Sequence, residues 1–346
     1  MRLEELDYEL PDELIAQRPP TDRDGARLLV VDAERGHRHA TIRDLPELLE
    51  PALWVVNDTR VIPARLHGHK PTGGAVELLL IEPLADDAGD ELWRCMGRSS
   101  KPIKVGLAVT LAEGFVGHVE AKHEDGTLDV RFEHGGDFDG LLEEHGQMPL
   151  PPYVQRPADA ADRERYQTIF ADRPGAIAAP TAGLHFTDAL VAALRERGHE
   201  LAPVTLHVGP GTFRPVQVEE LDEHPMHEER YEVPASTAAA IDAARSEGRA
   251  VVAVGTTVAR TLESAAIGDG RVQVGPGRTR LFIKPPYEAK VVDHLLTNFH
   301  LPRSTLLALV MALGGEDTLR AAYAEAVRAR YRFFSYGDAM LIRGRR

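Results

Sequence analysis

Two short loops combine a histidine with threonine and glycine, residue types that can transfer protons and bind a ligand through backbone groups. They are Thr181-Ala182-Gly183-Leu184-His185 and Thr205-Leu206-His207-Val208-Gly209. Each follows an apolar run typical of a buried strand. In open α/β sheets, ligands bind beyond the carboxyl ends of strands, where loops and helix N-termini converge. The stretch 178–213 therefore predicts a ligand site, although glycine and threonine also occur in ordinary connections.

Three further polar clusters follow apolar runs at predicted strand ends. Asn57–Arg60 follow the run Leu53–Val56, and Gly255-Thr256-Thr257 follow Ala250–Val254 and precede a predicted helix. The third cluster, Thr297–Ser304, also precedes a predicted helix. Backbone N–H groups at a helix N-terminus bind anions, and glycine permits close approach. These clusters extend the predicted site, although Asn and Asp also cap ordinary turns.

The motif His224-Pro225-Met226-His227-Glu228-Glu229-Arg230 combines two imidazoles with two carboxylates. Helical zinc motifs space their histidines at i and i+4, whereas this spacing is i and i+3, and Pro225 disfavours a helix. Histidine transfers protons near neutral pH, and an adjacent glutamate can tune it. We therefore expect a polar active-site segment here and no metal.

A second motif begins like a dinucleotide-binding loop. Gly209-Pro210-Gly211 has the first two glycines of that pattern, but Arg214 stands where the third is needed, and Pro215 disfavours an immediate helix. The sequence therefore does not indicate a nicotinamide enzyme.

The composition limits the class of protein. The chain has 346 residues, enough for one large or two ordinary domains, and a formal net charge of −14. That charge argues against a generic basic nucleic-acid binder. Cys95 is the single cysteine, so no internal disulfide can form. No run of about 18 apolar residues indicates a membrane span, and we expect a cytoplasmic protein.

One segment near the C-terminus is rich in basic residues, although the chain as a whole is acidic. It interleaves basic and aromatic side chains, namely Arg328, Arg330, Tyr331, Arg332, Phe333, Phe334 and Tyr336. This pattern is typical of surfaces that bind unstacked nucleotides. The end of a helix followed by a buried strand explains the same residues equally well.

The order of apolar runs predicts two domains. From 66 to 148, short apolar runs separated by turn signals are typical of a small β-barrel or sandwich. Residues 1–65 and 149–346 instead alternate predicted strands, such as Ala176–Ala179, with predicted helices. We therefore predict a large α/β domain with a mixed, largely parallel sheet, interrupted by a small inserted β-barrel domain.

Together these stretches resemble the S-adenosylmethionine:tRNA ribosyltransferase-isomerase family of queuosine biosynthesis. The matching segments span nearly the whole chain in the family's order. They are NDTRVIPARL at 57–66, MPLPPY at 148–153, AAPTAGLHF at 178–186, VTLHVGPGTFRPV at 204–216, HPMHEE at 224–229, VAVGTT at 252–257, VVDHLLTNFHLP at 291–302 and YRFFSYGDAM at 331–340.

The resemblance implies a reaction that composition and spacing do not reveal. The family transfers the ribosyl group of S-adenosylmethionine to 7-aminomethyl-7-deazaguanine at the wobble position of tRNA. The ribosyl group is isomerised to an epoxycyclopentanediol, which gives epoxyqueuosine, and adenine and methionine leave. S-adenosylmethionine is a consumed substrate, so we expect no separate cofactor and no metal. We also expect a monomer.

The chemistry of this reaction assigns hypothetical roles to residues. Proton transfers are needed at the carbon beside the sulfonium, at adenine and at the attacking amine, and the candidates are His185, His207, His227 and Glu228. The candidates for binding S-adenosylmethionine are Asp58, Thr181, Gly183, Gly209, Gly211, Thr212 and Glu229. The candidates for binding tRNA are Arg60, Arg65, Arg303, Arg332 and Tyr336, and Tyr336 is also a weaker candidate for contact with the sulfonium.

One segment departs from the family pattern, and two other functions stay open. Ile283-Lys284-Pro285-Pro286 stands where the family is expected to have Ile-Tyr-Pro-Gly, which puts the role of that loop in doubt. A small-molecule hydrolase that uses the His-Glu motif, without tRNA, is the alternative enzyme. A non-catalytic RNA-binding module built on the small barrel is the other alternative. The sequence does not assign a function to the small domain.

Overall fold

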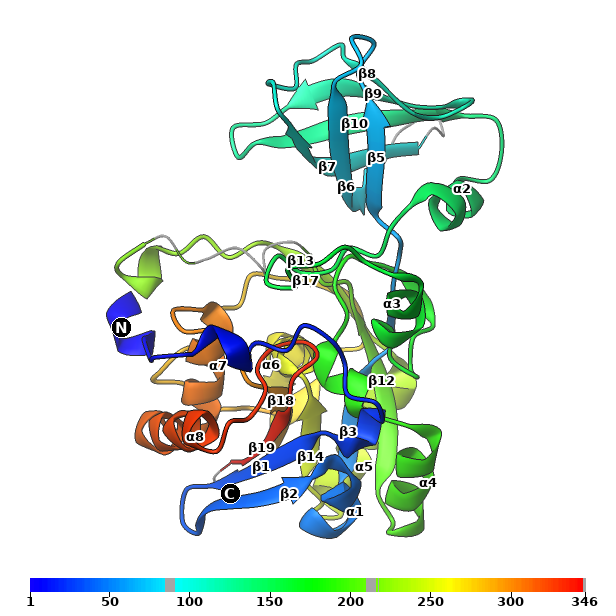
Figure 1. Cartoon of the computed structure of the whole chain (residues 1–346). Helices are drawn as coiled ribbons and strands as arrows, with labels where there is room; N and C mark the ends of the chain where they lie inside the picture. Colours follow the sequence, from blue (N-terminus) through cyan, green and yellow to red (C-terminus); the bar gives the residue numbers. More distant parts are fainter. Residues whose placement is uncertain (85–90, 210–215, 217, 345–346) are drawn as a thin grey trace.

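The structure, a computed structural model, describes residues 1–84, 91–209, 216 and 218–344. It has a large part built on one sheet and a small closed barrel that lies at one end of it (Figure 1). The chain enters the barrel after β4 (Thr59–Val61) and returns through the Pro-rich segment 148–153. The predicted fold class, a large α/β part interrupted by a small β-barrel, is confirmed.

Within the described residues, the large sheet has nine strands. In spatial order they are β17 (Gly275–Thr279), β13 (Glu229–Val233), β12 (Glu200–Leu206), β3 (Leu53–Asn57), β14 (Val251–Val254), β18 (His294–Asn298), β19 (Ala339–Arg343), β1 (Arg27–Asp32) and β2 (Gly36–Thr41). The central strands β12, β3, β14 and β18 are mutually parallel. Their carboxyl ends therefore meet at the same edge of the sheet, where ligands bind in open α/β folds.

Helices cover both faces of this sheet (Figure 1). Alternation along β3 is the reason, because Leu53 and Val55 face one layer and Trp54 and Val56 face the other. The first layer contains α5 (Ala235–Ser246), α6 (Thr256–Ala265), α7 (Thr305–Gly314) and α8 (Glu316–Arg328). The second contains α1 (Leu45–Leu48) and α4 (Asp188–Glu196). Burial on both faces explains why the central strands read as continuous apolar runs.

The barrel closes through six antiparallel strands in the order β10-β7-β6-β5-β8-β9. Their bounds are β5 (Arg65–His69), β6 (Ala75–Pro83), β7 (Glu91–Ser99), β8 (Ala108–Ala112), β9 (Phe115–Lys122) and β10 (Thr127–His134). Strands β6 to β10 contain the short apolar runs of the predicted β segment, at 75–81, 92–96, 107–111, 115–119 and 128–132. Strand β5 was not predicted, because Arg-Leu-His-Gly-His carries little apolar character. At Gly68, a Cβ would lie 2.5 Å from the backbone oxygen of Thr110, so only glycine lets β5 approach β8.

The remaining elements are short. They are α2 (Phe138–His145), α3 (Ala160–Arg165), β11 (Arg173–Ala176), β15 (Ala266–Gly268), β16 (Arg271–Val272) and the 3-10 helices η1 (Leu3–Leu6), η2 (Asp12–Leu14), η3 (Arg23–Gly25), η4 (Ile42–Asp44), η5 (Thr181–His185) and η7 (Leu221–Glu223). The strand expected at Ala176–Ala179 ends at Ala176, because β11 pairs only with β4 beside the main sheet. The first histidine loop therefore does not follow a strand of that sheet.

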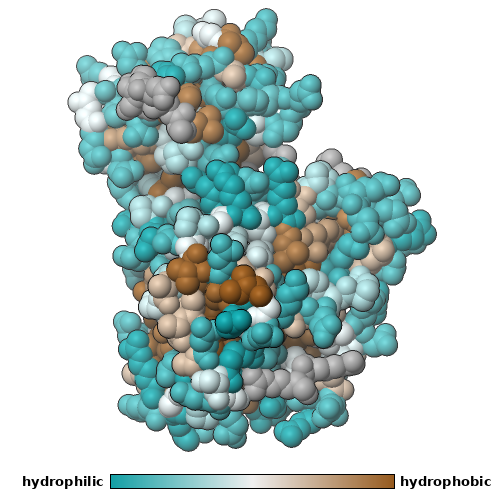
Figure 2. Space-filling view, turned by 180° about the vertical axis from the view of Figure 1, so that it is seen from behind, coloured by the Kyte–Doolittle hydropathy of each residue, from teal (hydrophilic) through white to brown (hydrophobic). Residues whose placement is uncertain are grey.

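The surface seen from the side opposite to Figure 1 is mainly hydrophilic, and hydrophobic residues gather on the large part below the barrel (Figure 2). None of the helices among the described residues is long and apolar enough to cross a membrane.

Candidate active site

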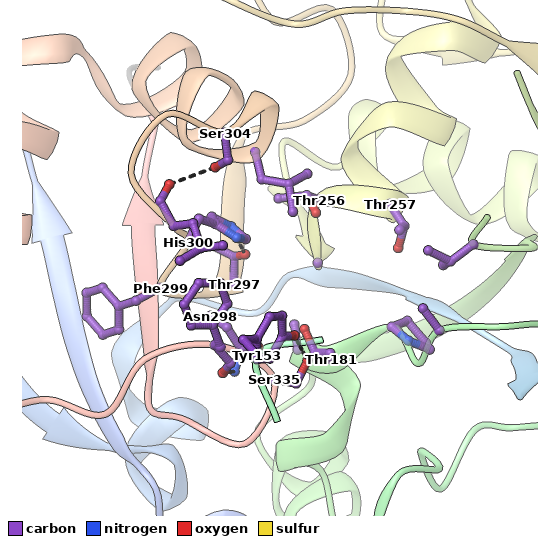
Figure 3. Close-up of a pocket in the computed structure, with 18 of the residues that line it drawn as sticks. Tyr153, Thr181, Thr256, Thr257, Thr297, Asn298, Phe299, His300, Ser304 and Ser335 are labelled. Atoms are coloured by element: carbon purple, nitrogen blue, oxygen red, sulfur yellow. Dashed lines mark hydrogen bonds between the residues drawn. The ribbon is translucent and has the colours of Figure 1, made fainter. Parts of the chain in front are cut away.

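A cavity of about 600 Å³ lies at the carboxyl ends of β14 and β18 (Figure 3). Its wall contains the starts of α6 and α7, the first residues of η5, and two distant segments around Tyr153 and Ser335. These segments converge because β14 and β18 are parallel neighbours in the middle of the sheet. The cavity thus occupies the place where a ligand site is expected in this fold.

Two helix N-termini line the cavity. Gly255 ends β14 with φ +97°, a conformation that favours glycine, and it lets α6 begin at once with Thr256 and Thr257. Ser304 caps α7, and its hydroxyl accepts a hydrogen bond from the Leu307 N–H at 3.2 Å. The first N–H groups of a helix lack intrahelical acceptors and carry partial positive charge. This side of the cavity therefore suits a carboxylate or another anionic group.

Aromatic and apolar side chains form another part of the wall. The rings of Tyr153 and Phe334 stack with centroids 4.3 Å apart, and the Tyr153 hydroxyl lies 2.5 Å from the Ser335 Oγ. Figure 3 shows Thr181 and Ser335 close together, while the Phe299 ring points away from the other labelled side chains. The described lining residues include no carboxylate. An aromatic wall of this kind can hold an apolar or a weakly hydrated cationic group.

His300 lines the cavity as a neutral imidazole. Its Nε2 lies 2.9 Å from the Thr297 Oγ1, and burial lowers its pKa to about 3. The Tyr323 hydroxyl accepts a hydrogen bond from the His300 N–H at 3.0 Å. These contacts fix the turn between β18 and α7.

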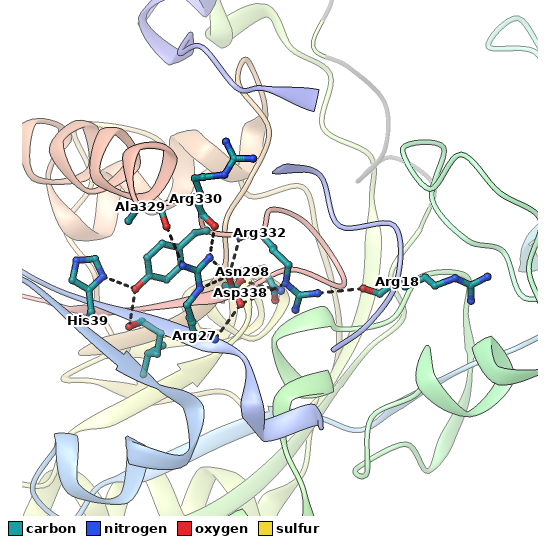
Figure 4. Close-up of polar contacts among 10 residues, drawn as sticks. Arg18, Arg27, His39, Asn298, Ala329, Arg330, Arg332 and Asp338 are labelled. Carbon is teal, nitrogen blue, oxygen red and sulfur yellow. Dashed lines mark hydrogen bonds and ion pairs between the residues drawn. The ribbon is translucent and has the colours of Figure 1, made fainter. Parts of the chain in front are cut away.

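A buried polar network holds the segment 332–338, which brings Phe334 and Ser335 to the cavity (Figure 4). Asp338 is 2% exposed and accepts hydrogen bonds from the backbone N–H of Arg332 at 2.8 Å and from the Arg27 Nε at 3.2 Å. The Arg27 guanidinium lies 4.2 Å from the centre of the Tyr331 ring. Phe334 therefore lines the cavity, whereas Phe333 and Tyr336 are buried and Arg332 is held by Asp338, which agrees with the structural explanation of their pattern.

The structure separates the two histidines of the paired loops. His185 is 3% exposed and lies behind the wall, with its Nε2 3.2 Å from the Asn298 Nδ2. His207 is half-buried after β12, with its Nδ1 2.8 Å from the Thr59 Oγ1, and the next residue, Val208, lines the cavity. Burial, with help from Arg230 and Arg173, lowers the pKa of His207. His207 is therefore neutral near pH 7 and is the better placed of the two to act as a base.

The His-Glu motif lies outside the cavity lining. His227 and Glu228 are exposed residues before β13. The Glu228 carboxylate contacts Arg278 at 2.5 Å and Arg280 at 3.4 Å, and the hydrogen bond from Arg278 lowers its pKa. Strand β13 pairs with β12, and the His207 N–H donates to the Arg230 oxygen at 3.2 Å, so the motif lies beside the end of β12 but outside the lining of the cavity. In the part of the chain that is described, no group of three or more His, Cys, Asp and Glu side chains is arranged to hold a metal ion.

Of the residues predicted to bind S-adenosylmethionine, Thr181 lines the cavity. Gly183 packs in η5, where a Cβ would lie 2.9 Å from the Thr168 side chain. Asp58 is buried below the strand ends and accepts a hydrogen bond from the Thr205 hydroxyl at 2.6 Å, and burial raises its pKa. Glu229 forms a buried ion pair with Arg260. Gly209 follows Val208, whereas Gly211 and Thr212 lie outside the described residues.

Of the residues predicted to bind tRNA, Arg303 is exposed and lines the cavity. Arg60 is exposed and lies 3.5 Å from Glu143 on α2. Arg65 contacts Glu77 at 3.4 Å. Arg332 is held beside Asp338. Tyr336 is 2% exposed and donates a hydrogen bond to Asp162 at 2.8 Å, so its buried side chain has no face for tRNA or for the sulfonium, contrary to both predicted roles.

Several cavity residues were not chosen as site residues from the sequence. They are Tyr153, Thr256, Thr257, Asn298, His300, Ser304 and Ser335. Their signal was present, because most of them belong to the polar clusters recognised at strand ends. What the sequence lacks is the information that these clusters, and not the His-Glu motif, share one cavity.

The fold and the site define an α/β protein with an inserted barrel and a ligand cavity at the carboxyl ends of parallel strands. The chain belongs to the family described as queuosine biosynthesis protein, whose model matches residues 3–342.

Relatives align over the whole chain. Proteins named S-adenosylmethionine:tRNA ribosyltransferase-isomerase are 56% identical in Anaeromyxobacter sp. (strain Fw109-5) and 54% identical in Sorangium cellulosum, with 99% of each chain covered. A crystal structure of S-adenosylmethionine tRNA ribosyltransferase from Thermotoga maritima is 39% identical, with a TM-score of 0.55, and the match covers 97% of this chain and 99% of that one.

Proposed function

We propose that this protein is an S-adenosylmethionine-dependent tRNA ribosyltransferase-isomerase. It transfers the ribosyl group of S-adenosylmethionine to 7-aminomethyl-7-deazaguanine at the wobble position of tRNA, and it releases adenine and methionine. The product is epoxyqueuosine in tRNA. Relatives that carry this activity in their names align over 99% of the chain, which supports the proposal. The protein consumes S-adenosylmethionine as a substrate, needs no other cofactor, and acts as a monomer in the cytoplasm.

One structural observation carries the proposal to particular residues, namely the cavity between the starts of α6 and α7 and the stacked rings of Tyr153 and Phe334. The helix N-termini suit the methionine carboxylate. The aromatic wall suits the weakly hydrated sulfonium. Its volume of about 600 Å³ also lies in the range of small-molecule sites.

His207 is the residue that we assign to proton transfer. When its Nδ1–H donates to the Thr59 hydroxyl, 2.8 Å away, the Nε2 lone pair stays free to accept a proton. The hydrogens on the carbon beside the sulfonium are acidified by the positive charge, so a neutral imidazole is a suitable base. Arg303, exposed at the cavity wall, is the residue that we assign to a tRNA phosphate.

The test is an assay of adenine release. The protein is incubated with S-adenosylmethionine and with tRNA that carries either the deazaguanine base or guanine at the wobble position. We expect adenine release only with the modified tRNA, together with equal formation of epoxyqueuosine. Adenine release without tRNA would instead support the small-molecule hydrolase.

A further inference from the structure

The small barrel carries a cluster of lysines at one end. Four of the six lysines of the chain belong to it, namely Lys70, Lys101, Lys104 and Lys122. Strands β5, β7 and β9 run in the same direction, because one antiparallel strand separates β5 from each of the other two. The connections that follow these three strands therefore lie at the same end of the barrel. Lys70, Lys101 and Lys104 lie in these connections, and Lys122 is the last residue of β9.

Two of these lysines line a hollow of about 380 Å³ at this end of the barrel, together with two serines. The four polar lining residues are Ser99, Ser100, Lys101 and Lys122. The described lining contains no carboxylate. Glu124 and Asp125 follow in the hairpin after β9 but do not line the hollow, and Asp125 accepts hydrogen bonds from the N–H and the hydroxyl of Thr127. The hollow therefore suits an anion.

The loop that carries Lys101 and Lys104 is held in place by contacts with the barrel. The Lys70 Nζ donates a hydrogen bond to the Lys101 backbone oxygen at 2.9 Å, and the Ser99 hydroxyl donates to the same oxygen at 2.5 Å. The Ile103 side chain is buried in the barrel core. Gly97 makes room for it, because a Cβ there would lie 2.7 Å from the Ile103 Cδ1. The exposed lysines before and after Ile103 are thus presented on a fixed loop.

The positive charge of this cluster is not neutralised by the protein. Among the residues that the structure describes, none of the four lysines forms an ion pair, whereas arginines of the barrel do, as Arg65 does with Glu77 and Arg131 with Glu120. The chain as a whole has a net charge of −14. Four unpaired cations at one end of a small domain therefore form a local positive surface, which attracts a polyanion.

The cluster lies far from the cavity of the large part. Strand β5 begins beside the large part, where the Arg65 N–H donates to the Gln147 oxygen at 3.2 Å, and Lys70 lies beyond its other end (Figure 1). Strand β9 has eight residues and so spans about 26 Å. Of the two substrates of the proposed reaction, only tRNA is long enough to contact the cavity and this end of the barrel at once. The wobble base must enter the cavity, so a more distant part of the tRNA reaches the lysines.

We propose that Lys70, Lys101, Lys104 and Lys122 bind backbone phosphates of the tRNA outside its anticodon stem-loop. A lysine ammonium acts on a phosphate as a point charge, so this contact positions the tRNA without reading its sequence. The inference rests on the proposed function, because it takes tRNA as the substrate. It gives the small domain a role, namely a second tRNA contact apart from Arg303 at the cavity.

The experiment measures dissociation constants by fluorescence anisotropy, for full-length tRNA and for its isolated anticodon stem-loop. In the double variant Lys101→Gln/Lys122→Gln, we expect the Kd for full-length tRNA to rise about threefold to tenfold, and the salt dependence of log Kd to weaken by about two phosphate contacts. The Kd for the stem-loop should stay at the wild-type value, because the stem-loop does not reach this end of the barrel. Lys101→Arg/Lys122→Arg keeps both charges and should bind full-length tRNA as the wild type does.

The matched control is Lys290→Gln/Arg271→Gln, which removes the same two charges from exposed positions of the large part and should leave both constants unchanged. Thermal unfolding of each variant shows whether it is folded. An unchanged Kd of Lys101→Gln/Lys122→Gln for full-length tRNA, an equal loss for both RNAs, or an equal loss in the control would overturn the inference. Failure of the wild type to release adenine with the modified tRNA would instead overturn the proposed function.

Discussion

At the scale of single residues, the three histidines near the cavity differ in which ring nitrogen already has a hydrogen-bond partner. His185 uses its Nε2 to hold Asn298, and His300 lies beside Thr297, whereas His207 contacts Thr59 through Nδ1. The similar sequences of the two histidine loops therefore conceal different tasks. One loop supports the cavity wall, and the other places the imidazole that we propose as the base next to Val208.

Replacing His207 tests this assignment. We expect His207→Ala to lower kcat by about 10²–10⁴-fold, because the reaction loses its general base. His118→Ala is the control, since His118 contacts Glu133 on the barrel, and its kcat should stay at the wild-type value. Single-turnover adenine release measures both. Full activity of folded His207→Ala would exclude the residue as the base.

The pH dependence follows from the direction of the pKa shift. Burial lowers the pKa of His207 below its ordinary value of 6.5, and the charges of Arg230 and Arg173 add to this. A base must be unprotonated, so kcat/KM should hold steady as the pH falls to 6.5 and decline only below it. Arg173→Gln removes one positive charge, which raises the pKa and should move this decline to higher pH. A decline that does not move would contradict the role of His207.

The buried carboxylate of Asp162 makes the stability of the protein depend on pH in acid. It accepts hydrogen bonds from Arg156 at 2.6 Å and from Tyr336 at 2.8 Å, and it has a pKa of about 2, since these partners outweigh the effect of burial, which alone would raise it. A carboxylate with a lowered folded pKa stabilises the protein above its unfolded pKa of 3.8, and this contribution disappears as the pH falls towards 2. As the pH falls through that range, the free energy of unfolding of Asp162→Asn should decrease by about 2 kcal/mol less than that of the wild type, as measured by denaturant unfolding. If the free energy of unfolding of Asp162→Asn depended on pH as it does in the wild type, the lowered pKa of Asp162 would be contradicted.

At the scale of elements, the pattern of apolar residues predicts the central strands of the sheet. Runs such as Leu53–Val56 and Ala250–Val254 became β3 and β14 because central strands are buried on both faces. The clusters after these strands were also recognised. The side chains that line the cavity were not predicted, because the contact between His185 and Asn298 joins residues 113 positions apart and local patterns carry no such information.

Gly255 determines where helix α6 begins. Its φ of +97° is unfavourable for an L side chain, and Gly255→Ala should lower the free energy of unfolding by about 1–3 kcal/mol. Because Gly255 directs the start of α6 into the cavity, KM for S-adenosylmethionine should rise as well. Gly135→Ala is the control, since a Cβ there meets nothing within 4 Å and its φ is not in the positive range. Equal effects of both substitutions in denaturant unfolding would contradict the strain at Gly255.

At the scale of the whole molecule, an acidic protein must bind a polyanion through a local surface. With a net charge of −14, long-range attraction of tRNA is weak, and we expect local contact residues such as Arg303 to supply the attraction. The KM for tRNA should therefore rise steeply with salt while the KM for S-adenosylmethionine changes little. Arg303→Ala should reduce the salt slope of log KM by about one phosphate contact. The control is Arg271→Ala, at an exposed position in β16, which should leave the salt slope unchanged. Equal slopes for both variants would contradict a contact between Arg303 and a tRNA phosphate.

We expect S-adenosylmethionine to bind at the carboxyl ends of β14 and β18. A crystal structure of the protein with S-adenosylmethionine tests it most directly. We predict density in this cavity, with the carboxylate at the start of α6 or α7 and the sulfonium beside the rings of Tyr153 and Phe334. Density at the His227 and Glu228 segment, with this cavity empty, would contradict the account.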